Sequence, residues 1–300
     1  MKIDKQNGNV CFNSDSHCYW NINDNEKYIS VTTLIHRFTQ PFDKEFWSAY
    51  KALEKLIPKD SWIIEKKSLL NSKKFDKSIL ELYNISEGKF NEVQQSILDD
   101  WDNENRKSCE RGTKIHEEIE HSFYDKPHNI SLQKFGIGGK FECRKDYAEL
   151  DLEYGVYPEY LIYRESDDGI LRIAGQVDLI IKSGNEITIV DHKTNKKIEQ
   201  KSGFNTSTRS TSKMKYPLNT LDDCNFWHYT MQLSTYAWML QKINPNFIIK
   251  DLILNHYDHN GNNTLYHCEY LKKEVERMLC FYKKELISER QKAKRKRIEY

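Results

Sequence analysis

The sequence predicts a mixed α/β fold, and two patterns indicate it. Three apolar segments have the branched and aromatic composition of β-strands, at residues 156–163, 170–182 and 186–193. They are followed by alternating helix and strand patterns: a helix at 226–243, strands at 248–258 and 264–268, and a helix from Lys272 onward. Residues 42–106 are rich in Lys, Glu, Leu and Trp and predict several helices. We therefore expect a domain at 107–300 with an N-terminal hairpin and helical elaboration at 1–106.

Shorter elements complete this outline. Residues 10–22 predict a hairpin, and Ser30 or Thr32 could start a short helix through Ile35. The glycines at 136–139 predict a flexible connection. Residues 194–224 form a long polar loop, and loops of this length are usually functional or disordered.

A hairpin with polar residues on one face points to chemistry. A Gly-Asn turn at 184–185 lies between two apolar runs, which is a strong hairpin signal. Counting outward from this turn places Asp178 directly opposite Asp191. The same count places Gln176 opposite Lys193. Opposed carboxylates lie ~5 Å apart and repel each other, so a divalent cation between them is the simplest explanation. An ordinary sheet edge with a solvated polar face is the alternative.

Two helices add candidate residues. Ile115, Ile119 and Phe123 recur at helical spacing, so residues 112–124 predict a helix that Thr113 could cap. His116 lies beside this apolar stripe, although a lone helical histidine is more often structural. On the helix at 226–243, Gln232 and Tyr236 are neighbours four residues apart.

The order of these motifs resembles that of a known nuclease family. The motifs are Gly112 to His116, Pro158-Glu159, Gly175 to Asp178, Asp191-His192-Lys193, and Gln232 to Tyr236. Together they resemble the RecB-like branch of the PD-(D/E)xK nucleases. The segment from Tyr28 to Ile35 also resembles the one that opens mitochondrial genome maintenance exonucleases and their phage relatives. The resemblance implies a restriction-endonuclease-like core, a central mixed sheet flanked by helices.

The residues suggest metal-assisted phosphodiester hydrolysis. Asp178 and Asp191 offer hard oxygen ligands that suit Mg²⁺ or Mn²⁺, and Lys193 faces the same side as Asp191. The resemblance implies that His116 is a metal ligand and that the backbone carbonyl of His192 is another. Its further implications concern three residues: Glu159 would bind metal directly or through water, and Gln232 and Tyr236 would support the site and position DNA.

Composition narrows the class of protein. The first residues are polar and give no signal-peptide pattern, and no run approaches the ~18 apolar residues of a membrane helix. Seven cysteines are scattered without a C-x-x-C pair, which predicts reduced thiols in the cytoplasm of a bacterium or a phage-infected cell. Some RecB-like nucleases bind an iron–sulfur cluster through a C-terminal cysteine group. Only Cys268 and Cys280 lie near the end of this chain, so we expect no cluster.

Basic charge is concentrated in two segments although the net charge is only +1. The loop after the catalytic strand carries Lys196, Lys197, Lys201, Arg209, Lys213 and Lys215. The segment from Lys283 to Arg297 contains eight basic and two acidic residues. We expect the loop to contact DNA phosphates because it leaves the catalytic strand directly. A solvated surface loop and a frayed helical tail are the alternatives.

These observations lead to a ranked set of functions. The first is a DNA exonuclease of replication, recombination or repair, with single-stranded DNA or duplex ends, and replication or recombination proteins, as possible partners. A structure-specific endonuclease on the same fold is the near alternative. A non-catalytic nucleic-acid-binding protein on a nuclease fold is the alternative from another class, but the intact Asp178, Asp191 and Lys193 set argues against it.

Overall fold

A computed structural model describes residues 2–144, 152–205 and 210–298. Their contacts divide the chain into two units. The first comprises residues 1–40, 114–204 and 211–300, and the second comprises residues 41–113 with 205–210. The boundary between residues 106 and 107 that the sequence suggests stays a prediction. No helix in the described ranges combines the length and the apolar character needed to cross a membrane.

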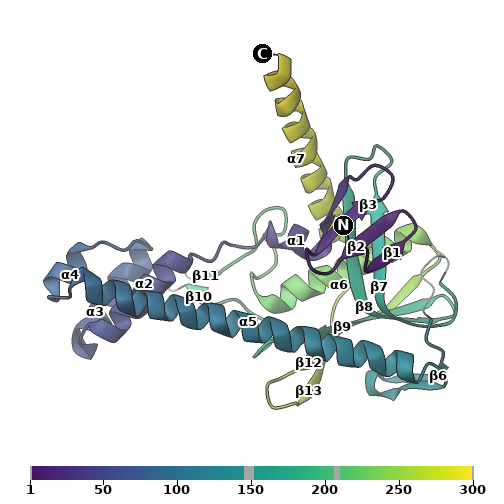
Figure 1. Cartoon of the computed structure of the whole chain (residues 1–300), viewed down its shortest axis with the longest axis horizontal. Coiled ribbons are helices and arrows are strands. Elements are labelled where there is room, and N and C mark those ends of the chain that lie inside the picture. The colour runs from purple at the N-terminus through teal and green to yellow at the C-terminus, as the bar shows by residue number, and fades with distance from the viewer. Residues whose placement is uncertain (1, 145–151, 206–209, 299–300) are drawn as a thin grey trace. The chain divides into compact units, whose positions relative to one another are not determined.

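The first unit is built on a mixed sheet, which confirms the predicted α/β core (Figure 1). The strands run in the order β1, β2, β3, β4, β8, β9, β12 and β13, and β7 pairs with β8. Their bounds are β1 Lys5–Asn7, β2 Val10–Asn13, β3 Cys18–Asn21, β4 Lys27–Ser30, β7 Gly155–Glu165, β8 Arg172–Ser183, β9 Glu186–Lys193, β12 Ile248–Tyr257 and β13 Asn263–His267. The strands β4 and β8 are parallel, as are β9 and β12, whereas β8 is antiparallel to β7 and β9.

The predicted β8–β9 hairpin is confirmed with its register. Ser183 pairs with Glu186, so the loop consists of the two expected residues, and Gly184 has a φ of +59°. Only glycine adopts this left-handed conformation at little cost, which explains the residue at the start of the turn. The ladder continues to the pair Leu179 and Val190.

Beyond that pair, the sheet opens at β8. The strand β4 pairs with Ile173 and Ala174, and β9 pairs with β8 only from Leu179 onward. Residues 175–177 pair with residues of β7. The next residues, Asp178 and Asp191, therefore lie where β8 and β9 separate rather than in a regular backbone pair, so side chains can enter the sheet there.

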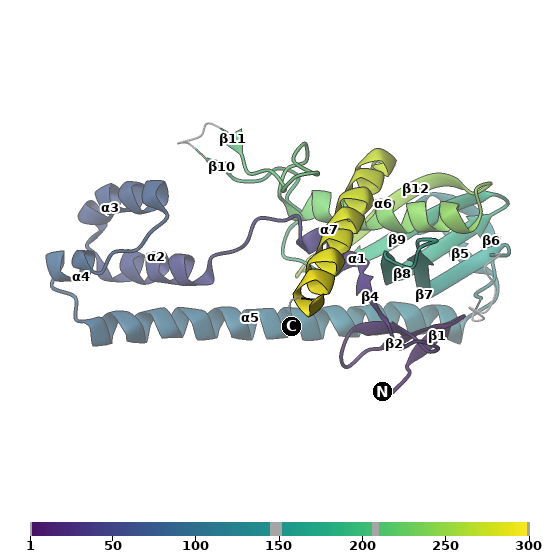
Figure 2. The ribbon, with the colours of Figure 1, turned by 90° about the horizontal axis from the view of Figure 1, so that it is seen from above.

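Helices cover both faces of this sheet. On one face, α1 Val31–His36, α6 Asn225–Ile243 and α7 Lys272–Ile298 share a core with Ile180 and Ile189 (Figure 2). On the other, Phe123 packs with Leu179 and Val190. Alternate residues of a strand point to opposite faces, so both faces of β8 and β9 are apolar and buried. Ser30 caps α1 by accepting a hydrogen bond from the Thr33 backbone N–H, as its sequence position suggested.

Two local expectations are wrong. The helix that carries His116 does not begin at Thr113 but is part of α5 Glu87–Asp125, a continuous helix of 39 residues. This segment contains no proline, and ion pairs four residues apart, such as Lys114 with Glu118 at 3.9 Å, support it. The glycines at 136–139 are not a flexible connection either. Gly136 directly follows the 3-10 helix Gln133–Phe135, and the other glycines lie in β6 Ile137–Phe141, which pairs with β5 Ile130–Leu132.

The polar loop after β9 is held by apolar anchors. Ile198 and Met214 are buried, and the loop includes the two-residue strands β10 Phe204–Asn205 and β11 Ser210–Thr211. Leu218 is also fully buried. Neither Ile198 nor Met214 could be recognised as an anchor from the sequence, because single apolar residues in a polar segment give no periodic pattern.

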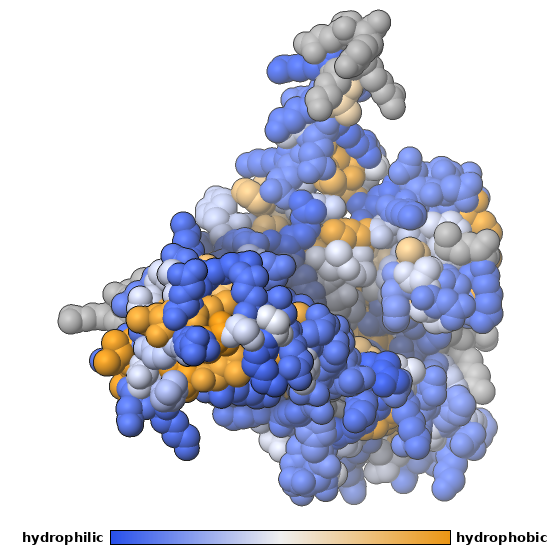
Figure 3. Space-filling view, turned by 60° about the vertical axis from the view of Figure 1, so that its left-hand side comes forward, coloured by the Kyte–Doolittle hydropathy of each residue, from blue (hydrophilic) through white to orange (hydrophobic). Residues whose placement is uncertain are grey.

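The second unit is helical. It contains α2 Lys44–Leu56, α3 Lys59–Ser72, α4 Ser78–Leu82 and the first part of α5. Leu53, Trp62 and Phe90 belong to its core. Figure 3 shows apolar surface on this unit, whose exposed large apolar side chains are Phe42, which precedes α2, and Ile63, Ile64, Leu70 and Leu82 in the helices.

Candidate active site

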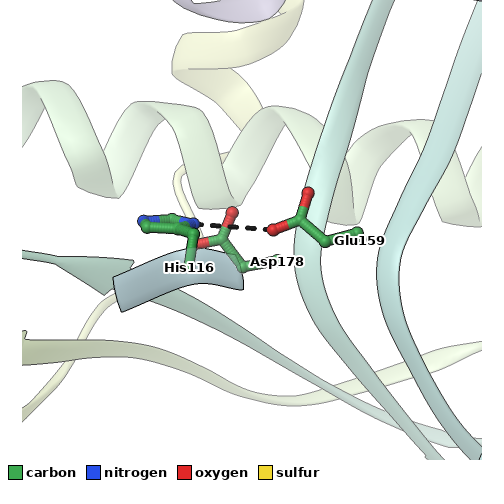
Figure 4. Close-up of side chains that lie close together, drawn as sticks. All are labelled: His116, Glu159 and Asp178. Carbon is green, nitrogen blue, oxygen red and sulfur yellow. Dashed lines mark ion pairs between the residues drawn. The ribbon is translucent and has the colours of Figure 1, made fainter. Parts of the chain in front are cut away.

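Side chains from α5, β7 and β8 converge where β8 and β9 separate (Figure 4). His116 Nδ1 lies 3.5 Å from Glu159 Oε1 and 3.6 Å from Asp178 Oδ2. The three potential ligand atoms all lie within 4.8 Å of one another. These separations are longer than hydrogen bonds, which span roughly 2.7–3.2 Å, and they leave room for one ion among the three.

The other ring nitrogen of His116 is already engaged. His116 Nε2 lies 3.0 Å from the backbone carbonyl oxygen of His192, to which it can donate a hydrogen bond. This arrangement leaves Nδ1 directed at the two carboxylates. Burial favours the neutral ring, but Asp178 and Glu159 outweigh it and raise the pKa of His116 to about 9.

Asp178 and Asp191 differ in their surroundings. Asp178 Oδ2 accepts a hydrogen bond of 2.6 Å from the His192 backbone N–H, which replaces a cross-strand backbone pair. Asp191 Oδ2 lies 2.6 Å from the ammonium of Lys193, and its Oδ1 accepts a hydrogen bond from Gln232. Among the described residues, Asp191 is outside the set of three clustered ligands.

Burial governs the charges of this region. It raises the pKa of Asp178, and it raises the pKa of Asp191 to about 6, with a further contribution from the neighbouring Asp178. Burial opposes the charge on Lys193, yet Asp191 and Asp178 raise the pKa of its ammonium. Lys193 therefore stays protonated, and the carboxylates of the site depend on nearby positive charge.

The His192 side chain belongs to the core rather than to the ligand cluster. Its ring is buried, and Nδ1 lies 3.1 Å from the Asn255 side-chain amide. Burial lowers the pKa of His192 to about 3, so the ring is neutral. The backbone carbonyl of His192 contacts His116 at Nε2, and its role as a metal ligand stays a prediction.

Gln232 and Tyr236 of α6 support Asp191. Gln232 Nε2 donates to Asp191 Oδ1 at 3.2 Å and lies 3.4 Å from the Tyr236 hydroxyl. Both side chains are buried. Tyr236 in turn packs against Gly175 of β8, where a Cβ atom would lie 2.7 Å from Tyr236 Cε1. The glycine of the Gly-x-x-Asp motif therefore makes room for the tyrosine ring.

Gly175→Ala should disturb this packing. The added methyl group would also lie 2.9 Å from the Tyr236 hydroxyl, so the buried ring must shift. We expect a loss of about 1–3 kcal/mol in the free energy of unfolding, measured in urea. Gly138→Ala is the matched control, because its Cβ would meet no atom within 4 Å. Equal stability of the two variants would contradict this role for Gly175.

Glu159 has an unusual backbone. Its φ is +49°, although it lies inside β7 and is not glycine. The flanking residues Pro158 and Tyr160 pair regularly with β8, so Glu159 is opposite Asp178 but leaves the ladder. Such a strained conformation often occurs at functional sites, where the surrounding structure enforces it.

Two residues that contact Glu159 were not among the predicted site residues. Gln176 Nε2 donates to Glu159 Oε2 at 3.3 Å, and Lys5 Nζ lies 3.9 Å from the same oxygen. The ammonium of Lys5 also lies 3.2 Å from Glu120 Oε1. The i, i+2 spacing of Gln176 and Asp178 could have identified Gln176, because both point to one face. An isolated lysine more than 150 residues from Glu159 gives no such signal.

The basic loop residues do not join this cluster as a set. Lys197 pairs with Glu199, and Lys213 pairs with Asp222. The Lys215 ammonium lies 3.5 Å from the backbone carbonyl of Arg37. The remaining predicted residues of this group are Lys196 and Lys201, which are exposed, and Arg209, which lies outside the described residues.

A family model matches most of the chain. The model described as the PD-(D/E)XK nuclease superfamily matches residues 80–296. A comparison with curated proteins gives no match.

Two solved structures share a general likeness with the chain. The structure of SSO0001 has 16% sequence identity and a TM-score of 0.36, with 87% of this chain and 76% of that chain covered. A protein from Eubacterium rectale, described as a candidate exonuclease, has 12% identity and a TM-score of 0.32, with 87% and 80% covered.

Proposed function

The chain belongs to the PD-(D/E)XK nuclease superfamily, and on this premise we propose that it is a divalent-metal-dependent deoxyribonuclease acting as an exonuclease. The observation that carries the proposal is the cluster of His116, Glu159 and Asp178 beside the Asp191–Lys193 ion pair. We also propose membership of the RecB-like branch and a role in replication, recombination or repair, on the order of the sequence motifs.

The donor atoms suit Mg²⁺ or Mn²⁺. Two carboxylates and an imidazole nitrogen make up the cluster, and carboxylate oxygens are hard ligands. Asp191 and the backbone carbonyl of His192 lie outside this cluster and are the further oxygen ligands that the sequence motifs suggest. When bound, the ion would polarise a scissile phosphate and lower the pKa of an attacking water. The residues that would hold it are His116, Glu159, Asp178, Asp191 and the carbonyl of His192.

Lys193 would supply fixed positive charge to the reaction. Its ammonium is held by Asp191 and lies 4.7 Å from the ring centroid of Tyr229. It can therefore orient the attacking water and stabilise the negative charge that develops on the phosphate in the transition state. Gln232 would keep Asp191 in place through its hydrogen bond, with Tyr236 behind it.

The basic loop would contact DNA phosphates. We propose this role for the residues that sequence analysis selected: Lys196, Lys197, Lys201, Arg209, Lys213 and Lys215. Phosphate contacts release counterions, so each lost contact should lower the log–log salt slope of binding by ~0.7–0.9. Lys196→Ala with Lys201→Ala should show this loss, and Lys126→Ala with Lys140→Ala is the control for exposed lysines elsewhere. An unchanged slope would make the start of the loop a solvated surface.

A digestion assay tests the proposed activity. Linear DNA labelled at either the 5′ or the 3′ end, single-stranded or duplex, is incubated with the full chain in Mg²⁺, Mn²⁺ or EDTA. We expect cleavage with either ion and none in EDTA, with label released from an end and closed circular DNA left intact. The absence of cleavage under all conditions would refute the proposed function.

The alternatives give different products. Cleavage of closed circular DNA, or internal cuts at a branch or a flap, would indicate a structure-specific endonuclease. Binding of DNA without cleavage in either ion would indicate a nucleic-acid-binding protein on a nuclease fold.

A further inference from the structure

Three hollows are lined by residues of the candidate active site, of α1 and of α7. The first is lined by Lys193 and Gln232 of the site together with His36. The second is lined by Arg37, which follows His36 in the sequence, and by Tyr216. It leads into a groove of about 690 Å³ along α7, because Tyr216 and Phe281 line both. We call this series the α7 track.

An aromatic ladder supports the middle of the α7 track. Phe38 is buried in the core, and its ring centroid lies 6.0 Å from that of Phe281. Phe281 in turn meets Tyr216 edge to face, with centroids 5.4 Å apart and an angle of 79° between the rings. Tyr216 is nevertheless 67% exposed. The ring is thus held by its edge contact while much of its surface faces solvent.

Basic side chains outnumber acidic ones along the same path. The basic residues that line the two hollows around Tyr216 are Arg37, Lys215, Lys273, Arg277 and Lys284, and the acidic ones are Glu276 and Glu285. Arg37 pairs with Glu285 at 3.4 Å, and Arg277 pairs with Glu274. Lys273 and Lys284 are exposed on α7. The track therefore has an excess of positive charge on both sides of the exposed ring.

We propose that the α7 track binds single-stranded DNA that enters or leaves the active site, with a base stacked on Tyr216. The proposal rests on the proposed nuclease function and names the form of DNA that the site receives. A groove of basic residues with an exposed aromatic ring is the arrangement that proteins use for single strands, since each base offers a face for stacking and each phosphate a charge. In a duplex, the base faces are covered by their neighbours, so Tyr216 would have no base to stack on.

The test is the affinity of the full chain for a fluorescein-labelled oligothymidylate, measured by fluorescence anisotropy in EDTA. Tyr216→Ala should weaken binding by about 5- to 150-fold, the range expected for loss of one stacked base. Tyr216→Phe should bind like the wild type, because the ring remains. Affinity for a blunt duplex of equal length should be unchanged in both variants.

Tyr154→Ala is the matched control. Tyr154 is another exposed tyrosine, stacked on Phe141 with centroids 4.9 Å apart, and it lies outside the track. The Tyr154→Ala variant should bind oligothymidylate like the wild type. Circular dichroism checks that each variant is folded.

A double lysine variant tests the α7 track without changing its aromatic residues. Lys273→Ala with Lys284→Ala should lower the log–log salt slope for oligothymidylate by ~0.7 per lost phosphate contact. Both residues are exposed on α7, so the change should not affect folding. Lys126→Ala with Lys140→Ala is again the control.

Several outcomes would overturn the proposal. They are wild-type affinity in Tyr216→Ala, equal losses for oligothymidylate and duplex, an unchanged salt slope in the α7 variant, or no binding of oligothymidylate by the wild type. If the wild type cleaves DNA but Tyr216→Ala binds normally, the track fails and the nuclease function stands. If binding depends on Tyr216 but no ion supports cleavage, the nuclease function fails and the track stands.

Discussion

Lys193→Met should lower the rate of DNA cleavage by about 10²- to 10³-fold or more, because it removes the cation positioned to stabilise the transition state. Methionine keeps an unbranched side chain of similar length that can still pack against Tyr229. Binding of Mn²⁺ should remain, since an ammonium is not a metal ligand. The measurement is single-turnover cleavage of end-labelled DNA at saturating Mg²⁺.

The control for this variant is Lys182→Met on the same hairpin, which lies away from the ligand cluster and should keep full activity. Lys193→Met also leaves Asp191 without its ion-pair partner, so thermal unfolding with and without Mg²⁺ should accompany the assay. Full activity in a folded Lys193→Met protein would remove Lys193 from the mechanism.

Asp178→Asn should weaken Mn²⁺ binding by at least about 10²-fold. Changing even the outer partners of a metal ligand costs ~10- to 100-fold in affinity, and loss of a carboxylate ligand should cost more. His116→Ala should have a smaller effect in the same direction, because the imidazole nitrogen contributes no negative charge to the attraction of the ion. Titration calorimetry of the EDTA-treated and dialysed protein measures both.

Glu118→Gln is the control for these two variants. Glu118 is on the same helix as His116, but its side chain is 65% exposed and pairs with Lys114. It should bind Mn²⁺ with wild-type affinity. Wild-type affinity in Asp178→Asn would instead show that the cluster of His116, Glu159 and Asp178 does not hold the ion.

The sequence predicted the parts of the fold that depend on local patterns. The β8–β9 hairpin followed from a two-residue turn between apolar runs, and the length of that turn sets the register, which the structure confirms. The helix α6 was predicted to begin at residue 226 and begins at Asn225. The mixed sheet was confirmed as well.

Features that depend on distant contacts could not be predicted in this way. Thr113 is a suitable helix cap by residue type, but nothing local shows that α5 already began at Glu87. Counting along the hairpin also could not show that its ladder ends after Leu179, where β8 and β9 separate. The ammonium of Lys5 reaches Glu159 only because β1 packs beside β7 in the folded chain.

Crystals soaked in Mn²⁺ would locate the metal by anomalous scattering. We expect a peak within bonding distance of His116 Nδ1, Glu159 and Asp178, and its loss in crystals of Asp178→Asn. A peak elsewhere on the protein, with the cluster empty at saturating Mn²⁺, would contradict the assignment of this cluster as the metal centre of the nuclease.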